Sequence, residues 1–84
     1  MLSKYAGVYK GLWGARPRLV DVTFIDGRLY VAVDGNERLP LIPQSATLFA
    51  ADGYYYAFIR DTGGLVTHVV ESHSTGDYTY ERQK

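Results

Sequence analysis

The sequence of 84 residues contains no cysteine, which excludes a disulfide framework and a thiolate zinc site. It also has no excess of charge, because nine basic and nine acidic residues cancel and are scattered along the chain. Nucleic acids and anionic membranes bind basic patches, so we expect neither as the main partner. No segment approaches the roughly 20 apolar residues of a membrane-spanning helix, and none has the character of a signal-peptide core.

Motifs for catalysis and cofactor binding are also missing. There is no Ser-x-x-Lys, the acylating motif of penicillin-recognising hydrolases. No stretch has helical periodicity, so a glycine-rich phosphate-binding loop would have no helix N-terminus to follow it. Ser72, His73 and Ser74 offer nucleophile and base types, but neighbouring residues on a strand or turn rarely face each other. We therefore expect no enzyme activity, cofactor or catalytic residue in this chain.

The most regular stretch is 53–71, GYYYAFIRDTGGLVTHVVE. Its two runs of aromatic and β-branched residues suit a pleated, partly buried surface, and residues 61–64 have turn-forming types. The pattern predicts a long β-hairpin with Phe58 pointing inward. With a four-residue link Phe58 would lie opposite Thr67, and with a link one residue shorter it would lie opposite Val66.

The rest of the chain repeats this pattern of short strands and tight turns. Asp-Gly pairs at 26–27, 34–35 and 52–53 are typical of hairpin turns. Residues 11–17, with two glycines, a proline and Trp13, are expected to form a loop. Pro40 predicts an edge strand or a bulge. Besides the two hairpin arms, strands are expected at 5–9, 19–25, 29–33, 38–42, 47–51 and 78–82.

About eight strands with turns every 8–12 residues indicate an all-β fold, a single antiparallel up-and-down meander over residues 1–84. The sheet is expected to curl into a barrel or to bend strongly, because an open sheet would leave free edges. If it does not close, the strand containing Pro40 or the first strand would be a free edge where self-association could occur.

Some polar residues have metal-ligand types. His68, Glu71, His73 and Asp77 are close in sequence, but His68 and His73 are five apart and would point to opposite faces of a strand. We expect no metal site, a half-buried His68 and a His73 that lies in a loop. Tight hairpin turns explain the calcium-like Asp-Gly pairs.

The aromatic residues support two interpretations. Tyr54, Tyr55 and Tyr56 place rings on both faces of one strand, and with Trp13 they could form a platform for a sugar or peptide. Alternatively, these rings fill the barrel and cover its outside or a neighbouring domain. Arg16 and Arg18 are expected in a solvated loop. The candidate interface or ligand contacts are Trp13, Arg16, Tyr54, Tyr55, Tyr56 and His68.

Several of these landmarks match a known family in order and spacing. The opening Leu2-x-x-Tyr5-x-Gly7-x-Tyr9 resembles the start of a domain of unknown function, the DUF3471 type. That domain follows the catalytic part of β-lactamase-related serine hydrolases. Further similar features, spread over nearly the whole chain, are Asp26-Gly27-x-Leu29, Leu41-x-Pro43, Phe49 and Phe58-x-Arg60-Asp61-x-x-Gly64-x-Val66.

The resemblance implies a lipocalin-like, eight-stranded antiparallel barrel that acts as a non-catalytic accessory domain. Such barrels pack on the catalytic domain of related D-aminopeptidases and esterases, and a barrel loop can shape substrate access. The family's catalytic residues belong to the other domain, so no residue here inherits a catalytic role.

The expected partner is a serine hydrolase catalytic domain, in the same chain or a separate one. Excision from a larger hydrolase would make a periplasmic or secreted location plausible. The alternative is a free-standing lipocalin-like barrel that binds a small apolar ligand.

Overall fold

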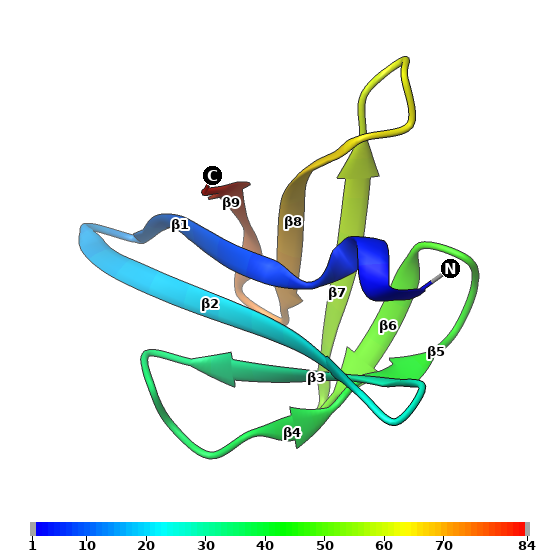
Figure 1. The fold of residues 1–84 in the computed structure, drawn as a ribbon. Helices are drawn as coiled ribbons and strands as arrows, with labels where there is room; N and C mark the ends of the chain where they lie inside the picture. Colours follow the sequence, from blue (N-terminus) through cyan, green and yellow to red (C-terminus); the bar gives the residue numbers. More distant parts are fainter. Residues whose placement is uncertain (1, 84) are drawn as a thin grey trace.

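The computed structural model describes residues 2–83, which form one 3-10 helix followed by nine β-strands (Figure 1). The elements are η1 (Leu2–Tyr5), β1 (Gly7–Trp13), β2 (Arg16–Ile25), β3 (Arg28–Val33), β4 (Leu39–Pro40), β5 (Ile42–Pro43), β6 (Leu48–Ala51), β7 (Tyr54–Arg60), β8 (Val66–His73) and β9 (Gly76–Arg82).

The strands form one antiparallel sheet in the order β4-β3-β2-β1-β9-β8-β7-β6-β5. Its two edge strands, β4 and β5, follow each other in the chain with only Leu41 between them, so the sheet is a nearly closed barrel (Figure 1). The Leu41 amide donates to the Leu29 carbonyl at 2.9 Å. The all-β, antiparallel, up-and-down prediction is confirmed, and Pro40 lies on an edge strand as expected. The strand expected at 38–42 divides at Leu41, which gives nine strands rather than eight.

The Asp-Gly pairs form the predicted hairpin turns. Asp26, Asp34 and Asp52 have φ values of 51°, 53° and 50°, and the glycine after each has a φ of 79°, 74° and 84°. Two successive residues with positive φ match the right-handed twist of the flanking strands. Aspartate tolerates this conformation better than most residues, and glycine adopts it freely.

Aromatic rings fill the barrel interior. Tyr5 stacks on Phe58 with ring centres 4.4 Å apart, Phe49 packs edge-on against both rings, and Tyr9 lies 6.0 Å from Phe58. The buried hydroxyls are satisfied, because Tyr5 donates to the Ala46 carbonyl and Tyr9 to the Tyr5 carbonyl, both at 2.7 Å. Side chains therefore occupy the space in which a larger barrel would hold a ligand.

Two predictions near the start of the chain were wrong. The strand expected at 5–9 begins only at Gly7, because Tyr5 belongs to η1 and the Ala6 amide bonds back to the Ser3 carbonyl. The segment 11–17 is not a loop: β1 runs to Trp13, Gly14 and Ala15 make a two-residue turn, and β2 begins at Arg16. Gly14, with a φ of 63°, permits this tight reversal.

The register of the β7–β8 hairpin differs from both expected alternatives. Phe58 points inward as predicted, with 3% of its surface exposed, but it lies opposite Val69. The link is longer than expected because the Asp61 side chain accepts bonds from the Gly63 and Leu65 amides, both at 2.9 Å. A register shift between Ile59 and Arg60 accounts for the rest of the difference in pairing, because Arg60 pairs with Val66 and Ile59 with His68.

Candidate functional site

An open recess of about 390 Å³ lies at one end of the barrel, bordered by residues in or next to the turns 14–15, 34–35, 52–53 and 74–75. We call it the mouth recess. One wall is apolar and comes from β3 and β4: Val31, Val33 and Leu39. The other is aromatic and polar and comes from β1, β2, β7 and β8: Trp13, Arg18, Tyr54, Tyr56, Glu71 and His73.

Glu71 is the buried polar centre of this end of the barrel. Its side chain is 1% exposed, and both carboxylate oxygens accept hydrogen bonds. Arg18 and Tyr80 donate to Oε1 at 2.8 Å each, and Tyr56 donates to Oε2 at 2.7 Å. A buried charge is tolerated only when it is paired and hydrogen-bonded, and these three donors meet both conditions.

The surroundings of Glu71 keep it ionised. Burial alone would raise the pKa of this carboxyl, but hydrogen bonds from Tyr56 and Tyr80, with His73 and the charge of Arg18 close by, hold the pKa below its usual value. The pKa values of the two tyrosine hydroxyls move the other way, upward. Burial, and then the bond to Glu71, raises the pKa of Tyr80 to about 12 and also raises the pKa of Tyr56.

An alkaline titration should reveal the raised pKa values of these tyrosine hydroxyls. Burial likewise raises the pKa of Tyr9 to about 12. A raised pKa in the folded state adds stability below the ordinary pKa of 10, and that stability is lost as pH rises from there to about 12. We expect Tyr9, Tyr56 and Tyr80 to ionise only as the fold is lost, measured by tyrosinate absorbance alongside circular dichroism.

The variant Tyr80→Phe is the control for this titration. It should reduce the late absorbance change by one tyrosine and leave the early change intact. Loss of all tyrosine protons in one step below pH 10 (the ordinary tyrosine value), with the fold intact, would contradict the assignment.

His73 lies within a cluster of aromatic rings beside Glu71. Its ring centre is 3.9 Å from that of Tyr54, 5.5 Å from that of Tyr78 and 6.3 Å from that of Trp13. Its Nε2 atom is 3.1 Å from Glu71 Oε1, yet it is buried and makes no hydrogen bond of good geometry. The prediction of a loop His73 was therefore wrong: it ends β8, and its side chain is only 9% exposed.

Arg18 joins the carboxylate network to the rim of the recess. Its guanidinium carbon lies 4.6 Å from the centre of the Trp13 ring, and its Nε is 3.7 Å from Asp34 Oδ2. The expectation that Arg18 sits in a solvated loop was wrong, because β2 begins at Arg16 and directs Arg18 toward Glu71.

The structure brings together half of the six residues expected at an interface or ligand site. Trp13, Tyr54 and Tyr56 all border the mouth recess. Arg16 is exposed at the start of β2, and Tyr55 is on the outer surface with 49% exposed. His68 is half-buried as expected, on the face of β8 opposite to His73, with its Nε2 3.9 Å from a Glu81 carboxylate oxygen.

The sequence pattern indicated Glu71 only as a potential metal ligand and gave no sign of the roles of Arg18 and Tyr80. One signal was available for Glu71: it is two residues after Val69, so it shares the inward face of the strand. A lone carboxylate on an inward face requires donors nearby. Arg18 could not be found this way, because it is 53 residues distant in sequence.

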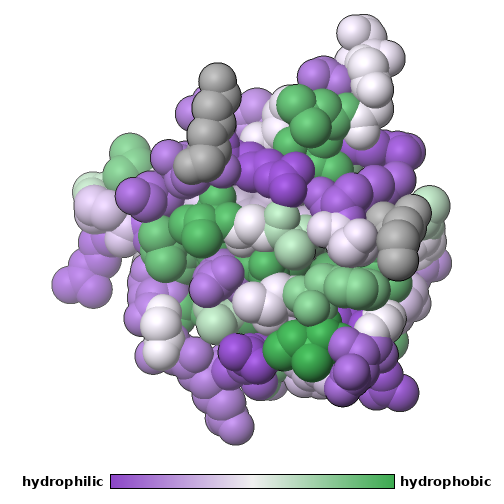
Figure 2. All heavy atoms as spheres, viewed as in Figure 1, coloured by the Kyte–Doolittle hydropathy of each residue, from purple (hydrophilic) through white to green (hydrophobic). Residues whose placement is uncertain are grey.

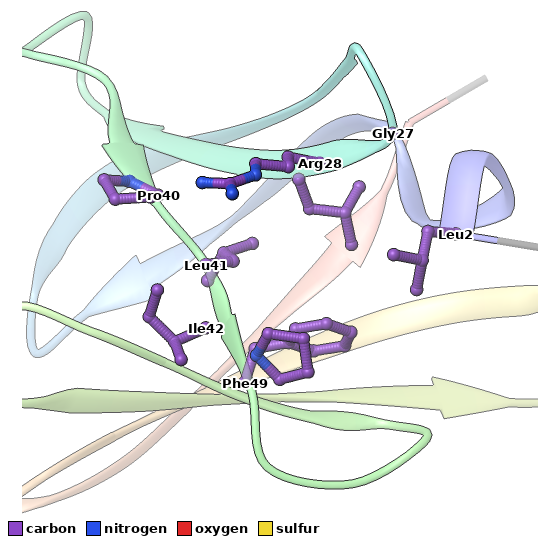
Figure 3. A pocket seen from close by; sticks show the side chains of 9 residues that line it. Leu2, Gly27, Arg28, Pro40, Leu41, Ile42 and Phe49 are labelled. Carbon is purple, nitrogen blue, oxygen red and sulfur yellow. The ribbon is translucent and has the colours of Figure 1, made fainter.

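A second hollow, of about 290 Å³, lies where the sheet edges meet. Leu2, Leu41, Ile42 and Phe49 surround it, with Arg28 and Pro40 at its border (Figure 3). Its lining holds one charged side chain and no other ionisable group. This hollow is consistent with imperfect packing at the junction of β4 and β5 and offers little for polar recognition.

The outer surface of the barrel differs between its two halves. On β6, β7 and β8 the outward positions lie opposite one another as Leu48–Ala57–Val70, Ala50–Tyr55–Ser72 and Ile59–His68. None of these is Asp, Glu, Lys or Arg. Ile42 extends the row on β5. We call Ile42, Leu48, Ala50, Tyr55, Ala57, Ile59 and Val70 the outer apolar face.

The remaining outer surface is mixed in character. Lys10 on β1 lies opposite Glu81 on β9, and Asp21 occupies the middle of β2. Over η1, β1 and β2, the side toward the viewer in Figure 2 intersperses hydrophilic with hydrophobic residues. The outer apolar face is thus a local feature of one half of the barrel.

Within residues 2–83, no group of three or more His, Asp or Glu side chains is arranged to hold a metal ion. No helix in the same range is long and apolar enough to cross a membrane. Comparison with known proteins gave no match to any family model, curated protein or solved structure. The resemblance to the DUF3471 type therefore stays a prediction.

Proposed function

We propose that this chain is a non-catalytic interaction domain that packs on the catalytic domain of a penicillin-recognising serine hydrolase, in the same polypeptide or in a separate one. The contact surface is the outer apolar face. The family resemblance names the partner, and the outer apolar face is the observation that carries the docking role.

The composition of this face supports a buried contact. Tyr55, Ile59 and Ile42 are 49%, 44% and 51% exposed. Tyrosine and large apolar residues are enriched at the centres of protein interfaces, where charged residues are depleted. Because this face has no Asp, Glu, Lys or Arg, removing it from water costs little free energy, and burying its apolar surface against a partner is favourable.

The packed interior supports docking over the alternative, a barrel that holds an apolar ligand. Tyr5, Tyr9, Phe49 and Phe58 are at most 3% exposed, and the first three rings each pack against Phe58. An apolar ligand in the middle of the barrel would have to displace one of these rings. The displaced ring would lose apolar packing contacts, and the ligand would only replace them with contacts of the same kind.

A binding measurement with a matched pair of variants tests this proposal. The partner is the Ser-x-x-Lys catalytic domain encoded in the same reading frame or in an adjacent gene, titrated by calorimetry. Ile59→Lys should weaken binding at least tenfold, because it places a charge in the buried contact. Ile25→Lys makes the same change at an isoleucine 37% exposed on the β2–β3 hairpin, and should leave affinity unchanged.

Equal effects of the two variants would contradict docking through the outer apolar face. The absence of a Ser-x-x-Lys domain from both the reading frame and its neighbours would contradict the choice of partner.

A further inference from the structure

We propose that the mouth recess is a binding site for a small organic cation, a primary amine with an apolar or aromatic body. This goes beyond the docking role, because the recess lies at an end of the barrel and the outer apolar face lies on its side.

The size and shape of the recess suit a small molecule. Its volume of about 390 Å³ is within the lower part of the range for ligand sites, roughly 300–1,000 Å³. Val31, Val33 and Leu39 form one wall, and Tyr54 and Tyr56 stand on the other. An apolar or aromatic body would be held between these walls, while a polar head would face the rim.

The charge of the recess favours a cation. Its lining holds three carboxylates, Glu37, Asp52 and Glu71, and one guanidinium, that of Arg18. Arg18 is already bonded to Glu71, so the net charge comes from Glu37 and Asp52, both exposed at the rim. Tyr54 and Trp13 are 39% and 38% exposed, and the parts of their rings that His73 and Arg18 leave uncovered add negative potential that attracts cations.

The unpartnered nitrogen of His73 indicates that a hydrogen-bond partner is missing at the recess. Its Nε2 is buried without a hydrogen bond of good geometry and lies 3.1 Å from Glu71 Oε1. Buried polar atoms are normally hydrogen-bonded, so an unpaired one calls for a bound water or ligand group. A ligand ammonium, with three donors and no acceptor, would complement the exposed carboxylates at the rim, Glu37 and Asp52.

The single tryptophan provides a direct readout. Trp13 is the only Trp in the chain and borders the recess, so its indole N–H gives one NMR signal that reports on the site. Phenethylamine should shift this signal saturably with a Kd of about 1 mM or tighter, typical for a ligand of so few atoms. Phenethyl alcohol should bind at least tenfold more weakly, and phenylacetate should give no saturable shift.

Paired variants separate the recess from overall charge. Glu37→Gln with Asp52→Asn should weaken phenethylamine binding at least tenfold, and asparagine tolerates the positive φ at position 52. Asp21→Asn with Glu81→Gln changes the net charge equally on the outer surface and should leave the Kd unchanged. Circular dichroism checks that all variants are folded.

Three results would overturn the proposal. These are no saturable shift with the amine, equal affinities for the amine and the alcohol, or equal losses in the two double variants. Ile59→Lys should not change the amine Kd, so failure of the docking role and failure of this site are distinguishable.

Discussion

Replacing Glu71 by alanine should lower the free energy of unfolding by about 3–5 kcal/mol, the range found when one partner of a buried ion pair is removed. The change would leave the Arg18 guanidinium and the hydroxyls of Tyr56 and Tyr80 without their acceptor. Domains are typically stable by about 5–15 kcal/mol, so the variant would lose a large share of its stability. Urea unfolding followed by circular dichroism measures the difference.

Two controls separate this network from the loss of any carboxylate. Glu81→Ala removes a side chain that is 74% exposed and should change stability by less than about 0.5 kcal/mol. Combining Arg18→Leu with Glu71→Leu should recover part of the loss, because removing both charges leaves neither unpaired. A loss below about 1 kcal/mol in Glu71→Ala would show that water replaces the network easily.

The second large effect is expected at Gly11. A Cβ atom there would lie 2.6 Å from the Thr79 carbonyl oxygen and 2.8 Å from Cδ1 of Tyr80. The first contact is with backbone, so β1 and β9 would have to separate. We expect Gly11→Ala to cost about 3 kcal/mol, at the upper end of overpacking effects, measured in the same urea experiment.

Gly63→Ala is the matched control for this steric argument. The nearest atom to a Cβ at Gly63 is Oδ1 of Asp61 at 3.4 Å, and its φ is not positive. Its stability should therefore change by less than about 0.5 kcal/mol. Equal losses at the two positions would indicate a general cost of replacing glycine and would contradict the steric role of Gly11.

The position of Gly11 also explains how the Glu71 network is reached. With no side chain at Gly11, the Tyr80 ring lies directly over β1 and its hydroxyl extends to Glu71. The Gly11→Ala variant should thus disturb the mouth recess as well as the pairing of β1 with β9.

Local chemistry made much of the fold predictable. Alternation of Val20 and Val22 with polar residues specified an inward face, and both are at most 2% exposed. The three Asp-Gly pairs specified turns because few other residues accept positive φ. Pro40 specified an edge because it has no amide hydrogen for a neighbouring strand.

Other features depended on contacts that a local pattern does not contain. The β7–β8 register is set by Asp61 Oδ1 accepting two amides, so the turn residue types alone left the link length open. The segment 11–17 was misread because Gly and Pro suggest a break, whereas Pro17 is accommodated in β2 opposite Leu12. His73 remains in β8 because its ring stacks on Tyr54 of the neighbouring strand.

The mouth recess was predictable only in part. Tyr54, Tyr56 and Trp13 attracted notice as aromatic residues, and the structure places them together. The acidic rim could not be recognised, because Glu37 and Asp52 belong to separate turns that meet only when the barrel closes. The pairing of Arg18 with Glu71 likewise required the strand order.

The strand order has a consequence for how the chain folds. Strands β1–β4 and β5–β9 are two meanders in which every pair joins neighbours along the chain, so their loops close with little entropy loss. Only β1 with β9 brings together distant segments, with Tyr9 opposite Arg82. We therefore expect the hairpins to form early and independently, and the pairing of β1 with β9 to be the slow step of folding.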